Sequence, residues 1–260
     1  MLQNEQMHTQ TRHTEILTQA RASGKVTASG LAVVLGVAVQ TIRRDLRQLC
    51  AAGLLERVHG GAVLPLGVRN VGYEDRRSLN RDAKQRIAQK AASLIPDHAT
   101  LFLNIGTTTE AVARALRNHR ELMVVTNNLN VANILATHPS CDVVVAGGNL
   151  RRSDGGLVGD LAALAIARFK VDYAVIGASA IDPDGDLLDF DPEEVRVSRQ
   201  IIDAARASMV VADASKLTRK APVRIASLSE VAHFVTDRIP SERMVNTLAD
   251  WNTKLQIASP

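Results

Sequence analysis

The stretch VAVQTIRRDLRQLCAAGLLERVHGGA, residues 37–62, decides how the N-terminal part of this chain folds. Ile42, Leu46 and Leu49 recur at steps of three and four residues, which places them on one face of a helix. The side chains that point to the other faces are polar or basic, and they comprise Gln40, Thr41, Arg43, Arg44 and Arg47. The pattern predicts a helix that packs through its apolar face and presents cations to solvent.

The segments on either side of this helix are typical of a winged helix-turn-helix. Residues 27–35 predict a shorter apolar helix, and Gly36 can form the sharp turn between the two helices. Two short β runs follow, residues 54–58 and 62–64, and the glycines between them permit a tight hairpin. Residues 9–23 predict a further helix in front of these elements.

Such a helix suits DNA recognition, because the major groove admits one α-helix whose N-terminal side chains meet base edges. Gln40 and Thr41 lie earliest in the helix, so we expect them to contact bases. The cations that follow in the helix and the wing are expected at phosphates or guanines, and they are Arg43, Arg44, Arg47, Arg57 and His59. The structural alternative is an ordinary helical hairpin with a solvated basic face. The turn, the wing and the cations together favour DNA binding.

Three motifs of this region resemble the N-terminal signature of DeoR-family bacterial transcriptional regulators. They are TIRRDL at residues 41–46, GLL at residues 53–55 and RVHGGA at residues 57–62. The chain departs from the family at Ala38, where Ser is usual, and at Gly30, where an acidic residue is usual. Loss of a capping hydroxyl at Ala38 costs about 1 kcal/mol, which weakens the helix start without excluding the motif.

Composition bounds the class of protein. The chain has 260 residues, of which 46% are hydrophobic and 3% aromatic, so two domains with largely aliphatic packing are expected. It contains no run of 18 uncharged apolar residues and no apolar leader, so we expect a cytoplasmic protein without a membrane partner. Cys50 and Cys141 have no partner cysteines for a disulfide framework or a zinc motif. Buried, reduced thiols are expected, with neither a metal nor a cofactor.

Charge separates the two parts of the chain. Residues 1–90 hold 14 Lys and Arg against 7 Asp and Glu, for a net charge of +7, whereas residues 91–260 have a net charge of −3. Residues 65–78 mix Pro, Gly and charge without an apolar period. We therefore expect a DNA-binding domain at residues 1–65, a linker at 66–81 and a second domain at 82–260.

The second domain alternates short apolar strands with amphipathic helices. The expected strands are residues 100–104, 122–126, 142–146, 172–177, 208–212 and 232–236. The expected helices begin at Asp82 and span residues 107–118, 129–137, 160–169, 193–207 and 241–250. This alternation predicts an α/β fold with a doubly wound, mostly parallel sheet. Ligands of such sheets bind beyond the carboxyl ends of the strands, where we look for a site.

The loop after the first of these strands has the chemistry of a phosphate cradle. Gly106 permits close approach of a ligand, and Thr107, Thr108 and Thr109 offer hydroxyls and amides at the start of a helix. Threonines also cap helices, which is the structural alternative.

The loops after the other strands supply further polar groups at the same edge. Asn side chains bind hydroxyls, Gly allows the backbone to approach a ligand, and Arg or Lys pairs with phosphate. Each loop alone is ordinary turn chemistry, and their common position is what favours a site. The residues expected to bind the effector there are Asn128, Gly147, Gly148, Arg152, Ser179, Asp191, Glu194 and Lys216.

The acid-rich segment 182–194 does not fit a calcium loop. Its glycine, Gly185, is the fourth residue from Asp182, whereas an EF-hand requires glycine at the sixth position. Asp191 followed by Pro192 and Glu194 predicts the start of a helix, with Asp as the N-cap. Asp191 and Glu194 remain able to accept bonds from ligand hydroxyls.

The loops extend the family resemblance over nearly the whole chain. Residues 106–108, 126–128, 146–148, 177–179 and 212–216 resemble the DeoR-family effector domain, which is similar in fold to ribose-5-phosphate isomerase. Residues 126–133 and 184–196 resemble one branch of the family, for which the resemblance implies a phosphorylated polyol as effector, with glycerol-3-phosphate as the first candidate.

The resemblance implies a repressor that binds double-stranded operator DNA and leaves it when the effector binds. The alternatives are a repressor that responds to another sugar phosphate, and a sugar-phosphate isomerase with a DNA-binding appendage. Ser179 stands where the isomerases have an acid, and a hydroxyl cannot replace the carboxylate that shuttles the proton, so no catalytic residue is expected. A homodimer or homotetramer is expected, because one recognition helix reads few base pairs.

Overall fold

The computed structural model describes residues 2–23, 25–51, 54–58, 60–63 and 72–259. The chain forms two compact units, residues 1–69 and 70–260, and each is described by itself. No helix among the described residues is long and apolar enough to span a membrane.

The first unit is a winged helix-turn-helix, as the sequence predicts. Its helices are α1 (Leu2–Ser23), α2 (Ala28–Leu35) and α3 (Val39–Ala51), and its strands are β1 (Lys25–Thr27), β2 (Glu56–Val58) and β3 (Gly61–Val63). The strands form an antiparallel sheet in the order β1-β3-β2, so β1 is an addition to the expected hairpin. The hydroxyl of Thr27 caps α2, and Gly36 ends α2 in the left-handed conformation with φ 63°. The expected turn between the two helices is therefore confirmed.

The apolar stripe of α3 closes the core of the first unit. Ile42, Leu46 and Leu49 are buried against Ile16 of α1 and Leu31 of α2. Burial of an aliphatic side chain of this size contributes about 1.5 to 3 kcal/mol to the stability of the fold. The three side chains together therefore hold α3 against α1 and α2.

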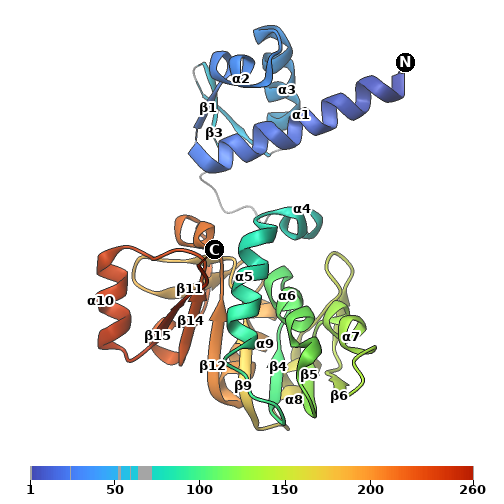
Figure 1. The fold of residues 1–260 in the computed structure, drawn as a ribbon, viewed down its shortest axis with the longest axis vertical. Helices are drawn as coiled ribbons and strands as arrows, with labels where there is room; N and C mark the ends of the chain where they lie inside the picture. Colours follow the sequence, from blue (N-terminus) through green and yellow to red (C-terminus); the bar gives the residue numbers. More distant parts are fainter. Residues whose placement is uncertain (1, 24, 52–53, 59, 64–71, 260) are drawn as a thin grey trace. The chain divides into compact units, whose positions relative to one another are not determined.

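The second unit is built on a seven-stranded, fully parallel sheet (Figure 1). Its order is β15-β14-β12-β9-β4-β5-β6, with bounds β4 Thr100–Leu103, β5 Leu122–Thr126, β6 Cys141–Val145, β9 Val171–Ile176, β12 Ala205–Val211, β14 His233–Thr236 and β15 Lys254–Ile257. The chain runs outward from β4 to β6 and then returns to β9 on the other side of β4. The switch point of this doubly wound sheet therefore lies between β4 and β9.

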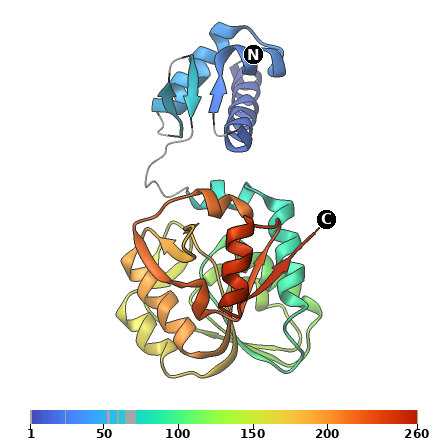
Figure 2. The same ribbon diagram turned by 90° about the vertical axis from the view of Figure 1, so that its left-hand side faces the viewer.

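Helices cover both faces of the sheet (Figures 1 and 2). One face carries α5 (Arg81–Ala92), α6 (Thr107–Ala115) and α7 (Leu129–Leu135), and the other carries α8 (Asp160–Ile166), α9 (Pro192–Asp203) and α10 (Glu242–Asp250). Along β4, Leu101 and Leu103 pack under the first set of helices and Phe102 under the second. This alternation is the period of a strand buried on both faces.

Two expected bounds differ from the structure, and several short strands were not expected. The expected linker contains helix α4 (Tyr73–Ser78), which belongs to the second unit because that unit begins at residue 70. The helix expected at 193–207 ends at Asp203, because residues from Ala205 pair with β9 as β12. The loops also contain short strands: β7 (Asn149–Arg151) pairs with β8 (Gly156–Val158), and β11 (Asp186–Asp189) pairs with β10 (Ala180–Ile181) and β13 (Val223–Ser227).

Candidate DNA-binding helix and effector site

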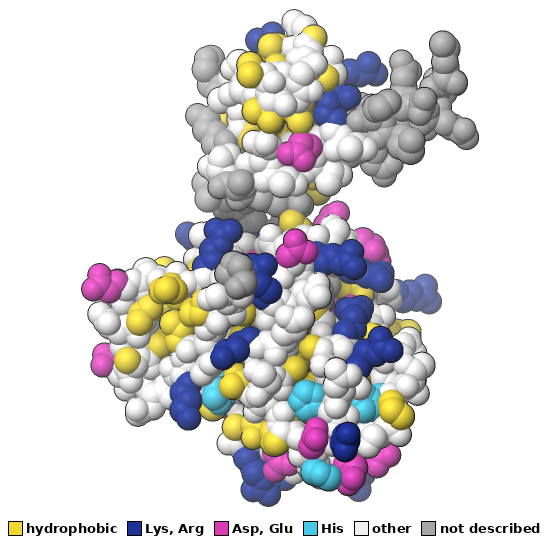
Figure 3. Space-filling model, in the orientation of Figure 1, with side chains coloured by type: hydrophobic (Ala, Val, Ile, Leu, Met, Phe, Trp, Pro, Cys, Tyr) yellow, Lys and Arg dark blue, Asp and Glu magenta, His cyan; other side chains and the backbone are white. Residues whose placement is uncertain are grey.

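The residues expected to meet DNA lie on the solvent side of α3. Thr41 is half-buried, whereas Gln40, Arg43, Arg44 and Arg47 are exposed, as is Arg57 of β2. On the visible face of the first unit, Lys and Arg side chains outweigh acidic ones near the position of α3 (Figure 3). His59 lies outside the described residues. Helix α3 thus presents at least three guanidinium groups on a face that the core does not use.

Asp45 fixes the orientation of α3 against α1. Its carboxylate is 2% exposed and accepts bonds from Arg12 Nε at 2.6 Å and Arg12 Nη2 at 3.1 Å. His13 Nε2 lies 3.2 Å from the same carboxylate. The hydrogen bonds from Arg12 neutralise a charge that burial would otherwise oppose. Asp45 is therefore a structural residue of α3 that faces α1 rather than the solvent.

In the second unit, we call the carboxyl ends of β4, β5, β9 and β12 the effector rim. The loop after β4 opens α6 with Gly106, whose φ of 145° is a conformation that residues with a side chain rarely adopt. No side chain caps α6, so amides of its first turn remain available to an acceptor. The positive end of the α6 dipole thus opens at the switch point of the sheet.

The three threonines of this loop do not all face a ligand. Thr109 is fully buried and donates its hydroxyl to the carbonyls of Asn104 at 2.7 Å and Gly106 at 2.6 Å. The hydroxyl of Thr109 is therefore engaged within its own loop, and a contact of Thr109 with the effector stays a prediction for its backbone amide. Thr107 donates to the carbonyl of Arg76 at 3.4 Å, and Thr108 is 7% exposed.

Buried cations gather next to the start of α6. Lys84 of α5 is 6% exposed and donates its ammonium to the Arg76 carbonyl, the group that also accepts from Thr107. Lys216, after β12, is 8% exposed. Arg76 and Arg219 complete a set that we call the cation cluster: Arg76, Lys84, Lys216 and Arg219.

Asp213 is the carboxylate that balances this cluster. It is 3% exposed and accepts bonds from Asn80 Nδ2 at 2.8 Å and the Ser215 amide at 3.1 Å. Burial opposes its charge, but the bond from Ser215 and the field of Lys216 hold its pKa below the usual value. Arg76 also pairs with Asp154 at 3.4 Å, and the field of Glu110 reaches Lys84, so Asp213 shares this role with two other carboxylates.

The pKa values of both lysines in the cluster are lowered. Burial, and then the field of Arg219, lowers the pKa of Lys216 to about 7. Burial also lowers the pKa of Lys84 to about 8, against the attraction of Asp213. Buried cations that lower each other's pKa in this way form a site prepared for an anion.

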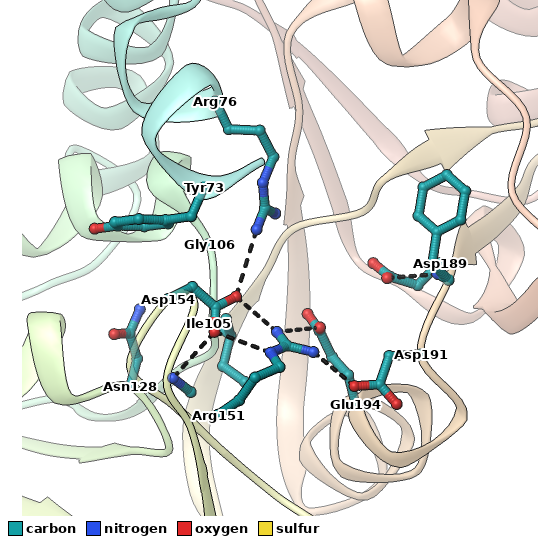
Figure 4. Close-up of polar contacts among 12 residues, drawn as sticks. Tyr73, Arg76, Ile105, Gly106, Asn128, Arg151, Asp154, Asp189, Asp191 and Glu194 are labelled. Atoms are coloured by element: carbon teal, nitrogen blue, oxygen red, sulfur yellow. Dashed lines mark hydrogen bonds and ion pairs between the residues drawn. The ribbon is translucent and has the colours of Figure 1, made fainter. Parts of the chain in front are cut away.

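A second charged group lies beside the Ile105–Gly106 loop and contains more acids than bases (Figure 4). Arg151 donates to both oxygens of Asp154, at 2.9 and 2.7 Å, to Asp191 at 2.7 Å and to Glu194 at 2.5 Å. Arg152, which we expected at the site, is exposed instead. Arg151 is the last residue of β7, whereas Arg152 lies in the turn that follows it, so a contact of Arg152 with the effector stays a prediction.

Glu194 is the most perturbed acid of this group. Burial, and then the field of Asp189, raises its pKa to about 7. The expected N-cap is confirmed, because Asp191 Oδ1 accepts the Glu193 amide at 2.9 Å. Glu194 does not close a capping box, since its carboxylate is turned to Arg151.

The remaining rim residues divide into ligand-facing and structural groups. Asn128 is fully buried and caps α7 through Oδ1, whereas its Nδ2 has no partner among the described residues. Ser179 is 6% exposed, and its amide donates to the Leu188 carbonyl of β11 at 3.0 Å. A Cβ on Gly148 would lie 2.8 Å from Ala162 Cβ, so Gly148 permits close packing against α8, and its contact with the effector stays a prediction. Gly147 is exposed with open space beside it.

Sequence reasoning missed Lys84, Arg76 and Arg151. Lys84 had a signal, because it precedes Ile87, Ala88 and Ala91 by three, four and seven residues and thus lies on the buried face of α5. A lysine on an apolar stripe marks a buried charge that needs a partner. Among the described residues, no group of three or more His, Cys, Asp or Glu is placed to hold a metal ion.

Two family models match the chain. The DeoR-like helix-turn-helix domain matches residues 12–66, and the DeoR C terminal sensor domain matches residues 79–238. Together they cover both units of the structure.

Curated relatives match over nearly the whole length. The glycerol-3-phosphate regulon repressor of Haemophilus influenzae is 46% identical over 248 residues, which are 95% of this chain and 96% of the relative. The protein of the same name from Escherichia coli K12 is 43% identical over 246 residues, with 95% and 98% covered. The HTH-type transcriptional repressor CsqR of Escherichia coli K12 is 39% identical over 249 residues, with 96% and 95% covered.

Solved structures resemble the second unit more distantly. A D-ribose-5-phosphate isomerase in complex with phospho-erythronic acid is 18% identical, with a TM-score of 0.40 over 53% of this chain and 54% of that chain. The eIF2B beta subunit of Chaetomium thermophilum is 16% identical, with a TM-score of 0.46 over 66% of this chain and 53% of that chain.

Proposed function

The chain belongs to the DeoR family of transcriptional regulators, and from this premise we propose that it is a DNA-binding repressor of glycerol-3-phosphate genes. We propose further that a phosphorylated polyol, with glycerol-3-phosphate as the first candidate, binds the effector rim and releases the repressor from its operator. The relatives support the regulatory role. The effector is argued from the chemistry of the rim.

The cation cluster carries the proposal for the effector. A phosphate dianion at the start of α6 would accept bonds from the amides of Thr107 and Thr108. Lys84 and Lys216 would supply buried positive charge. Glycerol lacks this anionic group, so it should bind far more weakly than its phosphate ester.

Polar groups on the other side of the rim are suited to the hydroxyls of a polyol. Asp189 and Glu194 are buried carboxyl groups that accept hydrogen bonds, and Asn128 Nδ2 is a buried donor without a partner among the described residues. Ser179 and Asp191 complete this polar wall. A site with fixed donors and acceptors discriminates strongly against ligands that leave them unpaired.

On the DNA side, we propose that α3 enters the major groove of the operator. Gln40 and Thr41 would meet base edges, and the exposed arginines of α3 and Arg57 would bind phosphates or guanine. His59 remains a proposed contact of the wing. A homodimer or homotetramer would place two such helices on two half-sites.

A second candidate function is weaker. A sugar-phosphate isomerase needs a carboxylate to move a proton between adjacent carbons, and Ser179 stands where the isomerases have an acid. The relatives matched over nearly the full length are named as repressors. Another sugar phosphate as effector is kept as an outcome of the test below.

Calorimetry with glycerol-3-phosphate, glycerol and a set of sugar phosphates tests the proposal. The phosphate ester of glycerol should bind most tightly, and Thr107→Asp should abolish binding because it places a negative charge at the phosphate position. Thr137→Asp is the matched control, because Thr137 is exposed and lies beyond the C-terminal end of α7. Tighter binding of glycerol than of its phosphate, or normal binding by Thr107→Asp, would remove this site.

A further inference from the structure

Helix α4 is held on the effector rim by polar contacts rather than by an apolar face. Tyr73 donates its hydroxyl to Glu110 Oε1 at 2.9 Å, and Asn130 Nδ2 donates to the Tyr73 oxygen at 3.0 Å. Arg76 Nη2 lies 3.4 Å from Asp154 Oδ2. None of the residues of α4 is buried, so few apolar contacts oppose its departure. Figure 4 shows Tyr73 and Arg76 reaching from α4 toward the rim.

The backbone of α4 occupies donors that the effector needs. The carbonyl oxygen of Arg76 accepts from the Lys84 ammonium and from Thr107 Oγ1. Lys84 and Thr107 are two of the groups assigned above to the phosphate. A carbonyl oxygen and a phosphate oxygen are both acceptors, so the Arg76 carbonyl and the effector phosphate compete for the Lys84 ammonium and the Thr107 hydroxyl.

In this covered arrangement, one hydrogen-bond donor of Arg76 lacks a partner among the described residues. The Nε–H of Arg76 is buried and has no partner among the described residues. Its guanidinium also adds a positive charge next to Lys84 and Lys216. A neutral carbonyl offsets little of the charge of the cation cluster, whereas a phosphate dianion offsets about two charges. The effector is therefore the stronger acceptor for the same donors.

The position of α4 in the chain gives its displacement a consequence. Helix α4 begins at Tyr73, and the second unit begins at residue 70, directly after the DNA-binding unit. The helix is thus the first element of the second unit to follow the segment that joins the two. Releasing α4 adds its residues to the connection between the two units, and a longer connection lowers the effective concentration of a second recognition helix at its half-site.

Resting on the proposed function, we propose that α4 is a displaceable cover of the effector site. The effector phosphate takes Lys84 and Thr107 from the Arg76 carbonyl, α4 leaves the rim, and the attachment of the DNA-binding unit loosens. The effector thus acts by competing with a segment of the chain that is continuous with the DNA-binding unit. Tyr73 and Arg76 are positioning residues of this cover.

Tyr73→Phe should bind glycerol-3-phosphate more tightly than the wild-type protein, although it removes a polar group beside the site. The variant loses the hydroxyl that bonds to Glu110 and Asn130, so the covered state is weakened while the phosphate-binding groups remain. For a ligand that binds only the open state, the apparent Kd equals the intrinsic Kd of that state divided by the fraction of protein in it. Loss of one hydrogen bond to a buried carboxylate should raise that fraction roughly tenfold, so glycerol-3-phosphate should bind roughly tenfold more tightly.

The matched control is Tyr173→Phe, which removes a hydroxyl from β9 of the same unit, where the ring packs against the core under α5, α6 and α7. It should leave the Kd unchanged. Weaker binding by Tyr73→Phe would overturn the proposal, because it would make Tyr73 a ligand-binding residue or a lid that closes on the effector.

Hydrogen exchange of the wild-type, full-length protein supplies a second test that needs no variant. Within α4, the Arg76 amide bonds to the Gly72 carbonyl at 2.9 Å and the Leu79 amide to the Asp75 carbonyl at 3.0 Å. Saturating glycerol-3-phosphate should speed exchange of these amides and slow that of residues 107–110. Slower exchange in both segments would overturn the cover and leave the effector site intact. Absence of binding in calorimetry would remove the proposed function itself, and the cover with it.

Discussion

Replacing Lys216 by Met should make the protein more stable and less able to bind its effector. Met keeps an unbranched side chain in a position that is 8% exposed, but it removes one positive charge from the cation cluster. Lowering the pKa of Lys216 from 10.5 to about 7 opposes folding by roughly 4 kcal/mol at pH 7, at about 1.36 kcal/mol per pKa unit. The variant relieves that cost.

The pH window of this gain follows from the two pKa values. The folded protein binds the Lys216 proton more weakly than the unfolded chain, so the cost is fully present below pH 7. It fades as the pH rises toward 10.5, where the unfolded chain also loses the proton. The stabilisation by Lys216→Met should therefore be largest near pH 7 or below and should be smaller at pH 9.

Effector binding should move in the opposite direction. A charged hydrogen bond to phosphate contributes about 1.5 to 3 kcal/mol, so glycerol-3-phosphate should bind roughly 10-fold to 150-fold more weakly to Lys216→Met. Denaturation at pH 7 and pH 9 and calorimetry would measure the two effects. Lys220→Met is the control, because Lys220 is exposed in the same loop. A Lys216→Met protein that is less stable than this control, or that binds glycerol-3-phosphate normally, would refute the reasoning.

Three further predictions concern pH, DNA and the first unit. Affinity for glycerol-3-phosphate should fall between pH 7 and pH 9, because the free protein loses the protons of Lys216 and Lys84 there, whose pKa values are about 7 and about 8. Calorimetry in buffers of different ionisation enthalpy should detect proton uptake on binding at pH 8. An affinity that does not change with pH would contradict this prediction. Arg44→Ala should weaken operator binding, and it should lower the salt dependence of binding by about one ion if Arg44 binds a phosphate. Gln40→Ala should lose about 1 to 3 kcal/mol of binding free energy, and only on operators that carry the preferred base. Unchanged operator affinity of these variants in fluorescence titrations would remove α3 as the recognition helix. Asp45→Asn should destabilise the first unit by about 2 kcal/mol, because it leaves a partly buried Arg12 without its carboxylate. The amides of α3 should then exchange their hydrogens faster than in the wild-type protein. Exchange at the wild-type rate would show that the Arg12–Asp45 pair does not stabilise the unit.

Periodicity was enough to predict the elements that bury apolar side chains. Residues 101–103 of β4 are all fully buried, and Ile42, Leu46 and Leu49 of α3 face the core as their spacing indicates. Strand β15 escaped prediction because it is an edge strand whose residues are exposed or half-buried. Helix α4 escaped because it has six residues and is held by polar contacts, which leave no apolar period in the sequence.

The site was less predictable than the fold for a geometric reason. The sequence places Gly106 and Thr107 at a strand end, which suffices to place this loop on the rim. Lys84 comes from a helix about 20 residues earlier, and only the fold brings it to the same carbonyl as Thr107. Arg151 and Arg152 are identical neighbours, and the choice between them depends on where β7 ends, which no local pattern specifies.

Operator binding measured with and without glycerol-3-phosphate tests the central claim most directly. If the effector rim controls DNA binding, the phosphate ester should weaken the operator affinity of the wild-type protein by about 5-fold to 150-fold, and glycerol should have no such effect at equal concentration. Thr107→Asp should bind the operator normally and stay bound when the ligand is added. Release of Thr107→Asp by glycerol-3-phosphate at wild-type concentrations, or wild-type operator affinity that no phosphorylated polyol changes, would contradict the account.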